Sequence, residues 1–102
     1  KMVKMIIREM EDTLVEVKAS CAGAMATRKK VQRDLDEATS KANDWNAKAE
    51  LAVEKGREDL AREALIEKRR YAERIDSLSA ERKHVDELVE QYKGDIVQLE
   101  EK

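Results

Sequence analysis

Apolar residues recur at alternating steps of three and four along most of the chain, which is the period of a supercoiling helix. The first series covers residues 3–52 and is interrupted by one charged residue, Arg28. The second series covers residues 61–99, where Lys68 and Arg82 are the charged exceptions. The pattern therefore predicts two long helices, each with one apolar seam along its length.

The two seams differ in phase, and the break falls within residues 49–68. An unbroken first seam would continue through Gly56, Asp59 and Glu63, which would place charge against the partner helix. Gly56 suits the left-handed residue that ends a helix, and acidic residues after it suit the start of the next one. We therefore predict an all-α fold, an antiparallel coiled-coil hairpin that forms a single domain. Its expected parts are a first helix over about 2–55, a turn over about 56–59 and a second helix over about 60–102.

Folding the chain back just after Gly56 brings the two seams together, with large residues mostly opposite small ones. The expected pairs include Ala38 with Ile75, Leu35 with Leu78, Cys21 with Tyr92 and Leu14 with Leu99. In this register Trp45 lies opposite Lys68, and we expect the lysine stem to cover a buried indole.

The first ten residues, KMVKMIIREM, extend past the second helix in this register. Their apolar side chains need a partner, which is the missing continuation of the second helix, another copy of the chain or a membrane. The chain begins without an initiator methionine and stops within a helical pattern. We therefore expect it to be a piece of a longer protein.

Composition supports a coiled coil, because 43% of the 102 residues are charged, 3% are aromatic and none is proline. A net charge of −2 gives no general attraction to nucleic acid, so direct nucleic-acid binding is not expected. The single cysteine, Cys21, lies on the seam and is interpreted as a small buried hydrophobe in a reducing setting. No apolar run is long enough to cross a bilayer.

The chemistry-bearing residues form no catalytic group. No nucleophile lies beside a base, no glycine-rich phosphate loop is present, and no histidine and cysteine set has metal-ligand spacing. We predict a protein that is not an enzyme and has no cofactor, no catalytic residue and no metal site.

A band of basic residues is the one charged feature that the register concentrates. This band allows two interpretations. It is either a docking site, for anionic lipid headgroups or for an acidic partner, or a solvated face that nearby acidic residues neutralise. The band consists of Arg28, Lys29, Lys30, Arg33, Arg82 and Lys83.

Two stretches, MIIREMEDTLVEVK at residues 5–18 and EKGREDLAREALIEK at residues 54–68, with Trp45 between them, resemble the phage shock protein A family. This family includes the plastid vesicle-inducing protein and belongs to the ESCRT-III superfamily. The resemblance implies a hairpin of two long helices in a homo-oligomeric protein, cytoplasmic and peripheral on the cytoplasmic face of the inner membrane. It also implies maintenance of membrane integrity and inhibition of the ATPase of an AAA+ transcription activator.

The resemblance also implies contacts between subunits at the hairpin tip. The tip residues implied by it are Arg57, Glu58, Asp59, Leu60, Ala61, Arg62 and Leu65. The family's amphipathic membrane helix and its later helices are not in this sequence, so we expect anionic lipids to be bound mainly by segments outside it. A structural spacer without a specific ligand is the alternative, and a monomeric hairpin and an arm-exchanged dimer both remain open.

Overall fold

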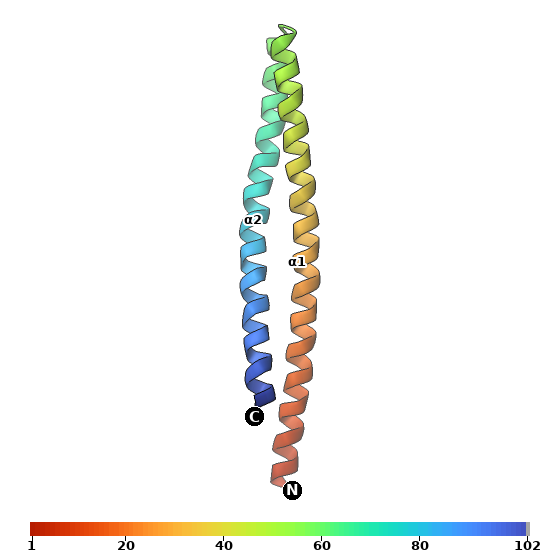
Figure 1. Cartoon of the computed structure of the whole chain (residues 1–102), viewed down its shortest axis with the longest axis vertical. Helices are drawn as coiled ribbons and strands as arrows, with labels where there is room; N and C mark the ends of the chain where they lie inside the picture. The colour runs from red at the N-terminus through yellow and green to blue at the C-terminus, as the bar shows by residue number, and fades with distance from the viewer. Residues whose placement is uncertain (102) are drawn as a thin grey trace. The chain divides into compact units, whose positions relative to one another are not determined.

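The computed structural model describes residues 1–101, and their regular structure consists of two long helices. Helix α1 spans Met2–Glu54 and helix α2 spans Glu58–Glu101 (Figure 1). The two run in opposite directions and are joined by a short turn. The predicted all-α antiparallel coiled-coil hairpin is confirmed.

The described chain divides into two compact units, and each contains part of both helices. The tip unit is Lys30–Arg82 and includes the turn. The open-end unit is Lys1–Lys29 together with the C-terminal segment that starts at Lys83. The expectation of a single domain over residues 1–102 stays a prediction.

The tip unit is held by a core between α1 and α2. Val31, Ala38 and Leu78 are buried at its centre. Three half-buried residues pack around them, namely Leu35, Tyr71 and Ile75. Four buried alanines continue the seam toward the turn, at positions 49, 52, 61 and 64. These contacts agree with the predicted register, and burial of these seam side chains contributes stability in proportion to their apolar area.

The open-end unit has a smaller core. Cys21, Val85 and Val89 are buried, and Val89 is fully enclosed. The prediction of a buried cysteine is therefore confirmed. An ion pair also joins the two helices of this unit, because Lys18 Nζ lies 3.2 Å from Glu100 Oε1.

Gly56 ends α1 through two backbone hydrogen bonds. The amide of Gly56 donates to the carbonyl of Val53 at 3.0 Å, and the amide of Arg57 donates to the carbonyl of Ala52 at 2.8 Å. This pair of bonds defines a Schellman motif, which requires a left-handed residue. Gly56 supplies it with a φ of 70°.

Helix α2 begins at Glu58, two residues before the predicted start, and residues 55–57 join the helices. The carbonyl of Arg57 accepts a bond from the amide of Ala61 at 3.0 Å, so Arg57 is the N-cap of α2. Glu58 and Asp59 therefore lie in the first helical turn, where their charge favours the positive end of the helix dipole.

Candidate functional site

A hollow of the tip unit lies between α1 and α2, next to the turn. It has a volume of about 600 Å³. Helix α1 contributes Trp45, Lys48, Leu51 and Ala52, and the turn and α2 contribute Lys55, Arg57, Leu60, Glu63 and Ala64. We call this hollow the tip groove. Its position follows from the seam alanines, because small side chains near the turn leave space that larger ones would fill.

The walls of the tip groove are apolar and partly open to solvent. Leu51 is 53% exposed and Leu60 is 44% exposed, although both are large hydrophobic residues. Trp45 is half-buried and also borders a second hollow of about 330 Å³ with Glu63, Ile66 and Glu67. Exposed apolar walls beside an aromatic ring are typical of a surface that binds another protein.

Three cations and one carboxylate line the same groove. Lys48 Nζ lies 4.3 Å from the centre of the Trp45 ring, which is a cation–π contact. Arg57 Nε lies 3.8 Å from Asp59 Oδ1, and both of these side chains are more than half exposed. The lining is net positive, because it contains Lys48, Lys55 and Arg57 but Glu63 as its one acidic residue. The groove therefore favours an apolar segment that also carries acidic side chains.

Trp45 is half-buried, so the expected burial of its indole is met only in part. Cover of the ring by the Lys68 stem stays a prediction. Lys68 Nζ donates to Asn46 Oδ1 at 2.7 Å, in a partly buried bond between the two helices. Lys48, about one turn along α1 from the tryptophan, places its ammonium group over the ring.

The tip residues that the resemblance implied are mostly at the surface. Six of them are exposed, and Glu58 also approaches Arg62 at 4.0 Å along the first turns of α2. Ala61 differs, because it is buried in the seam. Arg57 and Leu60 belong to the tip groove as well, whereas Leu65 lies outside its lining.

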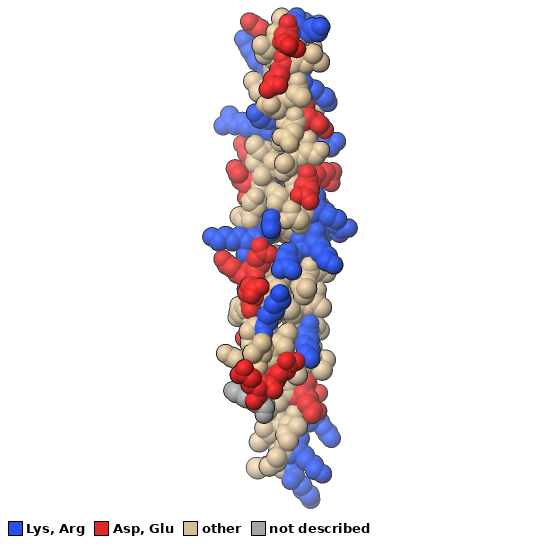
Figure 2. Space-filling model, viewed as in Figure 1, with Lys and Arg blue, Asp and Glu red and all other residues tan. Residues whose placement is uncertain are grey.

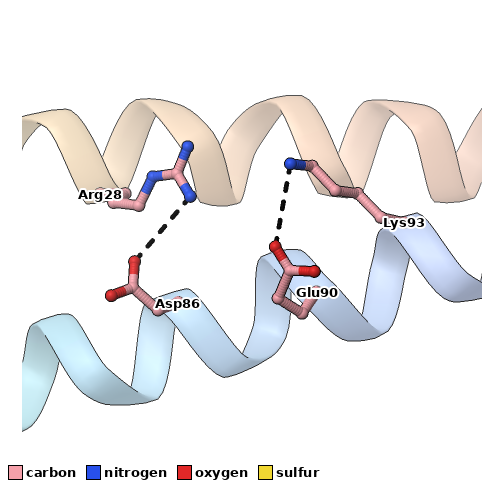
Figure 3. Close-up of polar contacts among 4 residues, drawn as sticks. All are labelled: Arg28, Asp86, Glu90 and Lys93. Carbon is pink, nitrogen blue, oxygen red and sulfur yellow. Dashed lines mark ion pairs between the residues drawn. The ribbon is translucent and has the colours of Figure 1, made fainter.

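The six residues of the predicted basic band are divided between the two units. Arg28, Lys29 and Lys83 belong to the open-end unit, and Lys30, Arg33 and Arg82 belong to the tip unit. Arg28 forms an ion pair with Asp86 at 3.9 Å (Figure 3). Basic and acidic side chains are interspersed on the face shown in Figure 2. The band as a docking site stays a prediction.

Among the described residues, the tip groove is suited to binding a partner. Across residues 1–101, no group of three or more His, Cys, Asp or Glu side chains is arranged to hold a metal ion. Neither helix, as far as it is described, contains a stretch apolar and long enough to cross a membrane. What the tip groove offers is an apolar, cationic surface between two helices.

The heptad pattern did not identify the tip groove, because the pattern reports seam positions alone. Lys48, Leu51 and Leu60 lie off the seam, and their side chains form the groove rim. One sequence feature could have indicated the groove, namely that Leu51, off the seam, stands next to Ala52, on the seam. A large exposed hydrophobic residue beside a small buried one leaves an apolar hollow.

These features define a structural class, the antiparallel hairpin of two long helices with coiled-coil seams. The PspA/IM30 family model matches residues 1–102. The chain therefore belongs to the PspA/IM30 family, and the resemblance seen in its sequence is confirmed.

The chain is also similar to curated proteins of longer length. The chain is 35% identical over all 102 residues to the membrane-associated protein Vipp1 of Nostoc punctiforme, of which it covers 40%. It is 36% identical over 81 residues, 79% of the chain, to the chloroplastic membrane-associated protein VIPP1 of Oryza sativa subsp. japonica, of which it covers 26%. It is 30% identical over 102 residues to a phage shock protein A homolog of Deinococcus radiodurans, of which it covers 46%. The chain thus spans less than half the length of these relatives.

Proposed function

We propose that this chain is the non-enzymatic coiled-coil arm of a protein that maintains membrane integrity under stress. The observation that carries the proposal is the family match over residues 1–102, together with relatives whose names describe them as membrane-associated. The hairpin supports it, because two helices packed along a seam give a stiff support for contacts with other subunits. The whole protein acts as a homo-oligomer, cytoplasmic and peripheral on the cytoplasmic face of the inner membrane, with anionic lipids bound mainly by segments outside this sequence.

Replacement of the arm in cells tests this function. In bacteria that lack their own family member, the full-length protein should restore the proton gradient after membrane stress. The same protein with residues 30–82 replaced by an unrelated antiparallel hairpin of equal heptad length should fail to do so. The replacement protein must be expressed and helical for the comparison to hold. Equal restoration by both proteins would favour the alternative function, a spacer without a specific ligand.

A second function, inhibition of an AAA+ transcription activator, rests on the family resemblance to phage shock protein A and on a surface suited to a protein partner. The exposed tip residues and the tip groove supply that surface. Addition of the chain to the activator's ATPase domain should lower ATP hydrolysis, and Leu60→Glu should weaken the effect. Unchanged hydrolysis at saturating chain would exclude the regulatory function for these residues.

The basic band supplies a further part of the proposal, a contact with anionic lipid headgroups. Charge reversal of Lys29, Lys30 and Lys83 together should then weaken cosedimentation with anionic vesicles. Binding equal to that of the unaltered chain would leave the band as a solvated surface.

A further inference from the structure

The tip groove is electrically uneven along its length. Two cations, Lys55 and Arg57, lie at the end that adjoins the turn. The acidic residue of the lining, Glu63, also borders the second hollow together with Trp45, so it lies toward the other end. Lys48 Nζ is placed over the Trp45 ring. The groove therefore has a positive end at the turn and an aromatic end about 15 Å away along α1.

The acidic residues of α1 near the groove lie away from its positive end. Glu50 and Glu54 are about a third of a turn or more from Lys48 around the helix, at about 100° per residue. Asp44 is on the Lys48 side of the helix but one turn farther from the hairpin turn. None of these three acids lines the groove.

The acidic residues at the start of α2 leave the two cations accessible. Asp59 approaches Arg57, but their side chains are 73% and 60% exposed. Glu58 approaches Arg62, which is outside the lining. Exposed pairs of this kind are weak, so the Arg57 guanidinium can also contact an anion. Even with Asp59 counted against Arg57, Lys55 leaves the turn end of the groove positive.

The middle of the groove suits a flexible apolar chain. Leu51 and Leu60 wall it and are about half exposed, so a chain laid against them would remove apolar surface from water. With bonds of about 1.5 Å and angles of about 111°, an extended hydrocarbon advances about 1.25 Å per bond. About twelve carbons therefore span the distance of about 15 Å between Trp45 and Lys55. The volume of about 600 Å³ is also that of a small-molecule site.

We propose that the tip groove binds a free fatty-acid anion of about twelve carbons. The carboxylate lies at the turn end, where it accepts hydrogen bonds from Lys55 and Arg57, and the chain runs past Leu60 toward the indole of Trp45. A free anion is favoured over a lipid in a bilayer, because the chains of a bilayer lipid are already out of water. Hydrolysis of membrane lipid esters is the class of reaction that releases such an anion. The site does not depend on the function proposed above.

Fluorescence of Trp45, the single tryptophan of the chain, reports on this site directly. The probe is sodium dodecanoate, kept below the concentration at which it forms micelles. Its titration should give a saturable change with a Kd of about 0.1 to 1 mM, as expected for a small ligand in an open site. Isothermal titration calorimetry should give one site per chain. Octanoate, which is shorter by four methylenes, should bind about tenfold or more weakly, and so should dodecyltrimethylammonium, which has the same chain length and a positive head.

Two exposed lining residues allow the apolar wall and the positive end to be altered separately. Leu60→Glu and Lys55→Glu should each weaken dodecanoate binding about tenfold or more. Their matched controls are Val53→Glu and Arg62→Glu, which lie outside the lining at a residue 67% exposed and at a side chain 80% exposed. Both controls should bind as the unaltered chain does, and all four variants should keep the helical circular dichroism of the parent. Added salt should weaken binding to the unaltered chain, because the positive end is exposed.

Four results would overturn the proposal. The first is a titration with dodecanoate that shows no saturable change below micelle formation. The second is equally tight binding of dodecyltrimethylammonium, which would indicate adsorption of any apolar chain. The third is a loss of binding in the control variants as large as that in the groove variants. The fourth is a change in Trp45 fluorescence with anionic vesicles but not with dodecanoate, which would assign the groove to a membrane surface.

Discussion

Arg28 of α1 reaches Asp86 of α2, with Nη1 3.9 Å from Oδ1 (Figure 3). Arg28 is the one charged residue of the first seam, yet its side chain is only 34% exposed. The arginine stem takes the place of an apolar seam residue while its guanidinium reaches the surface. Glu90 and Lys93, in the same view, pair within α2 at 3.9 Å. The open-end unit therefore accommodates charge at its seam by directing it outward.

The Arg28 and Asp86 pair should contribute little to stability. Both groups are about a third or more exposed, and solvent screens such pairs, so a coupling free energy below about 1 kcal/mol is expected. A double-mutant cycle with Arg28→Gln and Asp86→Asn, measured by urea denaturation, gives this quantity directly. A coupling well above that value would mean that the pair is desolvated.

Substitution of glycine by alanine should have opposite effects at two positions. Gly56→Ala should lower the free energy of unfolding by about 1 to 2 kcal/mol, because its φ of 70° strains an L residue. Gly94→Ala should raise that free energy by up to about 1 kcal/mol, since this glycine is helical and has open space around it. Urea denaturation of both variants checks the prediction, and a change of the same sign at both positions would contradict it.

A large residue at Ala38 should disrupt the core of the tip unit. Ala38 is 2% exposed and packs with Val31 and Leu78. Ala38→Trp should lower the free energy of unfolding by about 1 to 3 kcal/mol through overpacking. The matched control is Ser40→Trp, at an exposed position two residues away, which should change stability little. Equal melting temperatures for the two variants would show that the register is wrong.

The bond between Lys68 and Asn46 should stabilise the hairpin. Asn46→Ala removes the acceptor at 2.7 Å and leaves a partly buried ammonium group without it, so a loss of about 1 kcal/mol or more is expected. Asn43→Ala, at an exposed position on the same helix, is the control for loss of an amide. Thermal unfolding of the two variants should separate them clearly. If Asn43→Ala were equally harmful, the interhelical bond would not be the cause.

Cys21 should be protected from thiol reagents in the folded chain. The residue is 6% exposed, and a reagent reaches its thiol only when the helices of the open-end unit separate. Labelling should therefore be slow in buffer and rapid in denaturant. A Ser20→Cys variant in a Cys21→Ser background places the thiol at an exposed position and should react rapidly in both conditions. Equal native rates for the two thiols would mean that the unit is open most of the time.

Seam residues made the fold predictable, because their spacing depends only on helical geometry. Leu35 could be placed against Leu78, and Ala38 against Ile75, once the reversal was assigned to Gly56. The start of α2 was harder to predict from the sequence, because its N-cap is Arg57, a residue type without a strong capping preference.

The tip groove was harder to predict than the seam. Side chains off the seam can adopt several rotamers and contact several partners, and heptad spacing does not determine which. Lys68 bonds to Asn46, and Lys48 covers Trp45. Identification of such contacts needs the positions of side chains on both helices.

The turn at Gly56 also constrains how this hairpin can change length during evolution. Residues on α1 and α2 meet according to their distance from the reversal, as Leu35 and Leu78 do on either side of it. Seven residues inserted into one helix alone would keep each seam in phase but give every farther residue a new partner. Equal insertions at equal distances from Gly56 would preserve the pairs. Homologous hairpins of different length should therefore differ by matched heptads, gained or lost in both helices together.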